Sequence, residues 1–171
     1  MSIKIALTNL GKYNEGELNY SWLELPASQE EIDAAFEKIG VADDTEYEEY
    51  FITDYETDIE GLEIGEYENL DDLNELAERL EELDDIDRDT LQAVLEWQGG
   101  DISDIIDSLD NYCLYPNIQS NEDLGNYWIF ESGCYEVPEN LQYYIDCEKF
   151  GRDLAMEGNG FMSSYGWIEE H

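Results

Sequence analysis

Carboxylates are the most abundant side chains with acid–base chemistry in this sequence of 171 residues, which contains 45 Asp and Glu residues against seven Lys and Arg. The only histidine, His171, is the final residue, so Ser-His-Asp and Cys-His arrangements are absent. Pairs of carboxylates suited to glycoside hydrolysis arise by chance among so many acids, and no Walker or G-x-G-x-x-G loop is present. We therefore expect a protein that is not an enzyme.

The three cysteines, Cys113, Cys134 and Cys147, form neither an even set nor a C-x-x-C pair. Disulfide frameworks use even sets of cysteines, and structural zinc sites use closely spaced pairs. The sequence therefore predicts neither a disulfide framework nor a zinc site.

One stretch approaches a calcium-binding pattern. At positions 1, 3, 5 and 12 of a calcium loop stand Asp85, Asp87, Asp89 and Glu96. Position 6, where such a loop needs glycine for its sharp turn, is Thr90, and the residues after it read as a continuing helix. Divalent-cation binding is therefore kept as an alternative function, and no metal site is assigned.

The charge balance limits what this protein can bind. A formal net charge of −38 gives the electrostatic term that dominates nucleic-acid binding the wrong sign, and an anionic membrane repels the chain for the same reason. The content of 42% hydrophobic and 13% aromatic residues is unlike that of a disordered acidic tail, so we expect a folded chain. Basic proteins are the expected partners, whereas nucleic acid and membranes are not.

The sequence also bears on location. No apolar run reaches the length of a membrane span, and the N-terminus has neither the charged start nor the apolar core of a signal peptide. We therefore expect a cytoplasmic protein.

The amount and distribution of charge favour an elongated molecule. A compact chain of this length has a diameter of about 40 Å, whereas 38 charges at the density of duplex DNA extend over about 65 Å. Residues 1–40, 41–110 and 111–171 carry net charges of −4, −25 and −9, so most of the charge lies in residues 41–110. We predict small domains in a row, which also spreads the charge and lowers self-repulsion.

The middle region, residues 61–110, is predicted to be an acidic helical bundle. Leucines recur every three or four residues between positions 70 and 83, which is the spacing of a helix with one apolar face. Nearly every position between them is acidic, and Arg79 is the only cation, so the opposite face must present carboxylates. The apolar face consists of Leu70, Leu73, Leu76, Leu80 and Leu83.

Two further helices are predicted in this region. The first covers residues 87–97 and ends at Gly99, and the second covers residues 101–110, with an Asp at every third position outside. Each helix carries one carboxylate per about 5 Å of its axis, so three helices side by side approach the charge density of duplex DNA. Such a surface suits an enzyme that expects nucleic acid. The predicted binding surface consists of Glu75, Glu78, Glu81, Glu82, Asp84, Asp85, Asp101, Asp104, Asp107 and Asp110.

The N-terminal region, residues 1–60, is predicted to be a three-stranded sheet with one helix. The strands are expected at residues 3–7, 18–23 and 47–54. In the second strand, Leu18, Tyr20 and Trp22 alternate as on a half-buried strand. The segment Ser28-Gln-Glu-Glu31 is a capping box that starts the helix, and Gly40 supplies its left-handed C-terminal cap.

The C-terminal region, residues 111–171, is predicted to contain mixed helices and a short antiparallel sheet. A strand is expected at 112–115, and paired strands at 161–162 and 165–168. Low charge density and many aromatic residues favour this region for dimerisation, although the N-terminal region, at net −4, is also lightly charged. About half of these aromatics are equally explained as core. The predicted dimer interface consists of Tyr112, Leu114, Tyr115, Tyr127 and Trp128.

Four segments in the same order carry a resemblance to a known family. They are Leu7-Thr-Asn-Leu-Gly-Lys-Tyr-Asn-Glu-Gly16, Tyr50-Phe-Ile-Thr-Asp-Tyr55, Asn69-Leu-Asp-Asp-Leu-Asn-Glu-Leu76 and Gly151-Arg-Asp-Leu-Ala155. Together they resemble the ArdA antirestriction proteins of mobile genetic elements, over nearly the whole chain. The end of the chain, residues 160–168, follows the family pattern only loosely.

The resemblance implies an elongated α+β dimer of three small domains that mimics bent DNA. It implies occupation of the DNA groove of type I restriction-modification enzymes, formed by their specificity and modification subunits, inside a bacterial host cell. It also implies no catalysis and no cofactor. An alternative function is an acidic chaperone or buffer for basic DNA-binding proteins, which would bind any basic protein without preferring DNA-shaped clefts.

Overall fold

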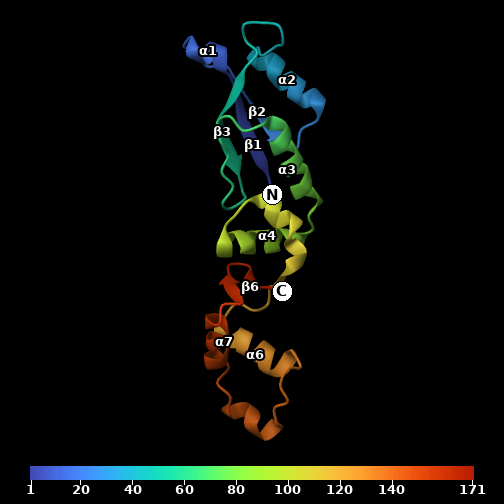
Figure 1. Ribbon diagram of the computed structural model, residues 1–171, viewed down its shortest axis with the longest axis vertical. Helices are drawn as coiled ribbons and strands as arrows, with labels where there is room; N and C mark the ends of the chain where they lie inside the picture. Colours follow the sequence, from blue (N-terminus) through green and yellow to red (C-terminus); the bar gives the residue numbers. More distant parts are fainter. The chain divides into compact units, whose positions relative to one another are not determined.

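The computed structural model describes residues 1–171, and the chain forms two compact units, Met1–Asp84 and Asp85–His171 (Figure 1). The first unit contains 26 acidic and four basic residues, and the second contains 19 acidic and three basic residues. The boundary falls inside the middle region that the sequence predicts to be a helical bundle. The division into three domains stays a prediction, whereas the α+β class is confirmed.

The first unit is a three-stranded antiparallel sheet with helices. Its strands have the order β2-β1-β3, so the N-terminal strand is central. The predicted strand–strand–helix–strand order is confirmed, but the short helix α1 is an addition. The elements are β1 (Ile3–Asn9), α1 (Leu10–Asn14), β2 (Tyr20–Leu25), α2 (Gln29–Ile39), β3 (Tyr50–Thr57) and α3 (Leu70–Glu82).

Helix α2 begins and ends where the sequence predicts. The Ser28 side chain accepts a hydrogen bond from the Glu31 amide, and the Glu31 carboxylate accepts one from the Ser28 amide. Gly40 ends the helix with φ of 74°, a left-handed conformation that glycine adopts without strain. The buried Asn9 side chain donates to the carbonyls of Ile39 and Gly40 at 3.2 and 3.0 Å, which fixes the end of α2 against β1.

Strand β2 buries the face opposite to the one that its alternation indicates. Leu23 pairs with Ile5 of β1, and both side chains are buried on the side of the sheet that α2 covers. The alternation of Leu18, Tyr20 and Trp22 is wrong as a guide to the core, because Leu18 and Tyr20 are 63% and 49% exposed. Apolar residues occupy both faces of this strand, so a period of two residues cannot distinguish the buried face.

The second unit combines short helices with a second antiparallel sheet, whose strand order is β4-β6-β5. The pairing of the last two strands is confirmed, and β4 joins β6 on its other side. None of the helices in the chain combines the length and apolar composition that crossing a bilayer requires. The elements are α4 (Asp85–Gln98), α5 (Ile102–Asp107), η1 (Leu109–Asn111), β4 (Tyr112–Tyr115), α6 (Asn121–Asn126), η2 (Tyr127–Glu131), η3 (Glu139–Tyr144), α7 (Cys147–Met156), β5 (Gly160–Ser163) and β6 (Gly166–Glu170).

Two glycines allow α6 and α7 to pack with their backbones in contact. A Cβ added at Gly151 of α7 would overlap the Asn121 carbonyl oxygen of α6, and one added at Gly125 of α6 would overlap the Cys147 carbonyl oxygen. Leu124 beside this contact is fully buried and packs with Ile118 and Trp167. The second unit therefore depends on a close helix crossing that has no room for a side chain.

The substitution Gly151→Ala should lower the free energy of unfolding by about 1–3 kcal/mol, because the added methyl group forces α6 and α7 apart. Chemical denaturation followed by circular dichroism would measure the loss. The matched control is Gly65→Ala, whose added Cβ meets only the end of the flexible Glu68 side chain. Equal stability of the two variants would show that the close crossing is not a constraint on this unit.

Candidate functional site

Helix α3 presents the most regular acidic surface of the first unit. The Asn69 side chain caps the helix by accepting hydrogen bonds from the amides of Asp71 and Asp72 at 2.8 and 3.3 Å. The buried residues of the helix lie on one side, as the leucine spacing predicts, although Leu76 is only half-buried and Ala77 takes its place in the core. This packing holds the opposite side of α3 toward solvent.

Four of the predicted acidic residues share this exposed side. Successive helix residues rotate by about 100°, which places Glu75, Glu78, Glu81 and Glu82 within an arc of about 120°. All four are exposed. They span about 10 Å of helix axis at a rise of about 1.5 Å per residue, or one carboxylate per about 3.5 Å. One strand of duplex DNA carries one phosphate per about 3.4 Å, so the two charge spacings are close.

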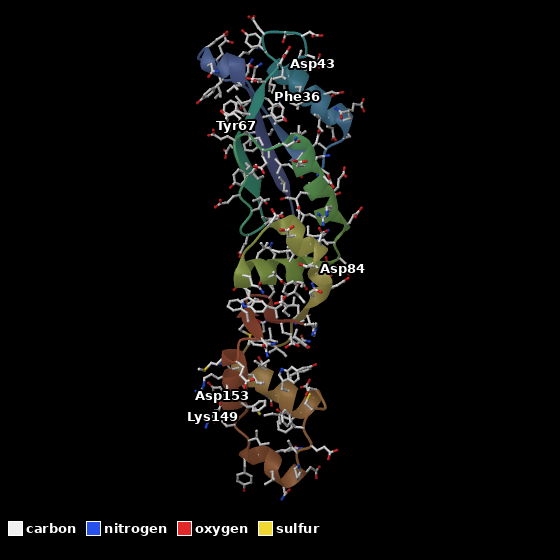
Figure 2. All side chains as sticks on the ribbon, viewed as in Figure 1. Phe36, Asp43, Tyr67, Asp84, Lys149 and Asp153 are labelled. Atoms are coloured by element: carbon white, nitrogen blue, oxygen red, sulfur yellow. The ribbon has the colours of Figure 1, made fainter.

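Two neighbouring positions extend this surface. Asp84, labelled in Figure 2, follows the end of α3 and is exposed. Asp71, in the first turn, falls within the same arc as the four glutamates and is also exposed. The sequence analysis omitted Asp71, yet the same count of 100° per residue would have found it. Its position beside the helix N-terminus also stabilises α3 itself.

The remaining predicted acidic residues lie in the second unit, where several of them have structural roles. Asp85 begins α4 and pairs with Arg88 at 4.0 Å. The Asp101 side chain caps α5, because it accepts hydrogen bonds from the amides of Ser103 and Asp104. The predicted repeat of an Asp at every third residue is therefore only partly a free surface. Asp104 and Asp107 of α5 and Asp110 of η1 are exposed to solvent.

The calcium-loop pattern lies in a helix. Asp85, Asp87, Asp89 and Glu96 all belong to α4, whose helical path excludes the turn that an EF-hand loop makes around its ion. The Glu96 carboxylate instead accepts hydrogen bonds from the Ser164 amide and hydroxyl, at 2.8 and 2.7 Å. Nowhere in the chain do three or more His, Cys, Asp or Glu side chains gather in an arrangement that could hold a metal ion.

The predicted dimer residues are half-buried within the second unit. Tyr115, Tyr127 and Trp128 pack against its core, and the rings of Tyr115 and Tyr127 lie 5.1 Å apart. Burial, followed by the neighbouring Cys113 and Glu169 side chains, raises the pKa of the Tyr115 hydroxyl, which donates to Glu169 at 3.0 Å. Tyr112 and Leu114 lie on β4, an edge strand of the sheet.

A more exposed apolar patch was missed by the sequence analysis. Tyr143 and Tyr144 of η3 are 98% and 85% exposed, and Leu141 beside them is 50% exposed. Pro138 at a first helical position predicts a helix with Leu141, Tyr144 and Ile145 on one apolar side. The segment is instead a 3-10 helix whose tyrosine side chains project into solvent. The adjacent Tyr143 and Tyr144 were the sequence signal for this exposure, because a helix with one buried side does not bury two successive side chains.

Comparison with known proteins gives a family match that extends over both units. The sequence model of a family described as Antirestriction protein (ArdA) matches residues 5–169. No curated protein matches the chain. The matched range includes α3, α5 and all but the outermost residues of the two sheets.

Neutralising the exposed face of α3 should stabilise the fold. The triple substitution Glu75→Gln, Glu78→Gln and Glu82→Gln should raise the melting temperature by about 2–5 °C at low salt, because it reduces repulsion among like charges. Salt screens this repulsion, so the difference should shrink at high ionic strength. Calorimetry at both ionic strengths would measure the effect.

The control for this experiment is Glu31→Gln. The Ser28 amide and hydroxyl lower the pKa of the Glu31 carboxyl, so the folded state favours its charged form. This variant also removes one negative charge, but we expect no increase in melting temperature, since the charged form is bound in the capping box. A triple variant less stable than the wild type would contradict the role assigned to repulsion.

Proposed function

We propose, because this chain belongs to the ArdA antirestriction protein family, that its acidic surface imitates DNA in the groove of type I restriction-modification enzymes. Membership of the family implies an antirestriction function exerted through interaction with restriction-modification enzymes. More specifically, the protein acts in this proposal as a competitive inhibitor that performs no catalysis. Its partners are the specificity and modification subunits, so restriction and modification are both blocked, in the cytoplasm of a bacterial host.

The observation that carries this proposal is the charge spacing on α3. Its four glutamates place one carboxylate per about 3.5 Å, close to the phosphate spacing of a DNA strand. A DNA-binding groove is lined by Lys and Arg side chains that pair with phosphates. The same Lys and Arg side chains can pair with carboxylates held at the same spacing, although a protein helix joins these carboxylates in place of a sugar-phosphate backbone.

The rigidity of the helix adds to this effect. A disordered acidic segment would lose conformational entropy when it bound, whereas α3 is already ordered by its cap and its buried leucines. No hydrogen bond or ion pair within the chain engages Glu75, Glu78 or Glu82, so these carboxylates need not give up an internal partner. In the other unit, Asp104 of α5 and Asp110 of η1 are also exposed.

We also propose that the protein acts as a homodimer. The second unit has the lower net charge, −16 against −22, so two copies meeting there repel each other less. Of its apolar residues, Tyr143 and Tyr144 are the most accessible, and they extend the predicted interface beyond the half-buried Tyr115, Tyr127 and Trp128. A dimer would double the charge offered to the enzyme.

A competition experiment tests the inhibitor proposal. Increasing amounts of the protein should displace target DNA from a type I methyltransferase at low salt, and rising salt should weaken the displacement steeply. The variant Glu75→Gln, Glu78→Gln, Glu82→Gln should bind the methyltransferase about tenfold more weakly, since three exposed charges are lost. Fluorescence anisotropy of labelled DNA would report both results.

The matched control removes three carboxylates from the first unit outside α3, in Glu30→Gln, Asp33→Asn and Glu37→Gln on α2. Equal losses in the two triple variants would point to net charge alone and support the alternative of an acidic buffer for basic proteins. DNA that stays bound at saturating protein and low salt would refute competition.

The dimer proposal has its own test. The double substitution Tyr143→Ser and Tyr144→Ser should convert the dimer to a monomer, because it removes the most exposed aromatic surface of the second unit. Light scattering coupled to size-exclusion chromatography would give the mass. The control is Tyr67→Ser, which removes a tyrosine that is 73% exposed in the first unit. Dimers that persist in the double variant would place the interface elsewhere.

A further inference from the structure

The face of the first sheet that α2 does not cover carries a groove of about 420 Å³. Tyr50 and Phe51 are successive residues of β3 and therefore point to opposite faces. Phe36 of α2 packs on Tyr50, whereas Tyr67 stacks on Phe51. The groove thus lies on the side of Phe51. It is lined mainly by Tyr13, Tyr20, Trp22, Phe51, Asp54 and Glu66.

The groove is assembled from segments that are distant in the sequence. Trp22 of β2 and Asp54 of β3 both pair with Ala6 of the central strand, so they stand on the same face at neighbouring positions. The Ile52 amide donates to the Glu66 carbonyl at 2.8 Å, which places the segment before α3 beside β3. Aromatic residues and two acidic residues therefore line one space.

This face already holds a cation of the chain itself. The Lys4 ammonium lies 5.2 Å from the centre of the Trp22 ring, and 3.7 Å from the Glu56 carboxylate. A cation over an aromatic ring is attracted by the negative face of the ring. Asp54 and Glu66 are exposed and have no cation beside them. Positive charge is therefore the chemistry that this groove accepts, and the chain leaves its two lining carboxylates unneutralised.

We propose that this groove binds an arginine side chain presented by a partner protein. A guanidinium is planar, so it stacks on an aromatic ring while its N–H groups donate to carboxylates in the same plane. Trp22 and the half-exposed Tyr20 supply the rings, and Asp54 and Glu66 supply the carboxylates. A lysine ammonium, compact and strongly hydrated, uses this combination less well.

The negative charge of the first unit favours an arginine side chain in the groove over other ligands. A nucleic acid or a second copy of this chain brings further negative charge to a first unit whose net charge is already −22. An uncharged apolar ligand would leave the two carboxylates without partners. The arginine site does not rest on the proposed DNA mimicry, since it uses shape and aromatic contact, whereas the acidic face of α3 uses charge spacing.

The test measures binding of two short peptides to the full-length protein by calorimetry, one bearing arginines and the other bearing lysines at the same positions. The wild type should bind the arginine peptide about threefold or more tightly than the lysine peptide. The substitution Trp22→Leu should abolish this preference. Shifts of the Trp22 indole resonance on addition of the arginine peptide would locate the contact.

A second pair of variants separates the groove from general charge. Asp54→Asn with Glu66→Gln should weaken binding of the arginine peptide about threefold or more beyond the loss caused by Glu75→Gln with Glu78→Gln, which removes the same charge from α3. Equal losses, or equal binding of the two peptides by the wild type, would overturn the proposal.

A third variant tests the proposal independently of Trp22→Leu, in case that variant does not fold. Lys4→Met retains the aliphatic stem but removes the cation from the Trp22 ring, so the arginine peptide should bind more tightly. The control Lys38→Met, on α2, makes the same change in net charge away from the groove. If both lysine variants strengthen binding equally, the peptide responds to net charge and the groove is not its site.

Discussion

Repulsion among like charges is the constraint on which the rest of this structure depends. With 45 acidic residues against seven basic ones, ion pairs can neutralise only a small fraction of the carboxylates. The fold must be held by apolar contacts, and each unit has its own buried residues, such as Ile5 and Leu7 in the first and Leu124 and Trp167 in the second. Carboxylates then occupy the outer positions, where water and salt screen them.

Some of these carboxylates contribute to the fold and others do not. Glu31 and Asp101 cap helices, and Glu96 binds the loop at Ser164, so their charges are used within the chain. Glu75 and Glu78 on α3 have no such role. We expect the removal of charge from positions of the second kind to relieve repulsion, since these carboxylates do not serve the fold. An exposed acidic surface of this kind is what the proposed competition for a DNA-binding groove requires.

Local signals in the sequence predicted the local structure well. The capping box at Ser28 and the leucine spacing of α3 act over a few residues, and the structure confirms both elements. The buried face of β2 depends on which side α2 covers, and the groove beside Trp22 depends on three segments meeting through strand pairing. Such contacts between distant residues leave no periodic signal. The acidic surface of α3 could therefore be identified from the sequence, whereas the groove beside Trp22 could not.

The exposed side of α3 has a consequence for how the protein can evolve. Glu75, Glu78 and Glu82 are exposed and are not among the buried residues of α3, so we expect that exchanging Glu for Asp there leaves the core of the unit unchanged. Related chains can therefore diverge at these positions while keeping their leucines. Under the proposed inhibition, substitutions on this face alone could match a host enzyme that had changed the basic residues of its groove, without a new fold.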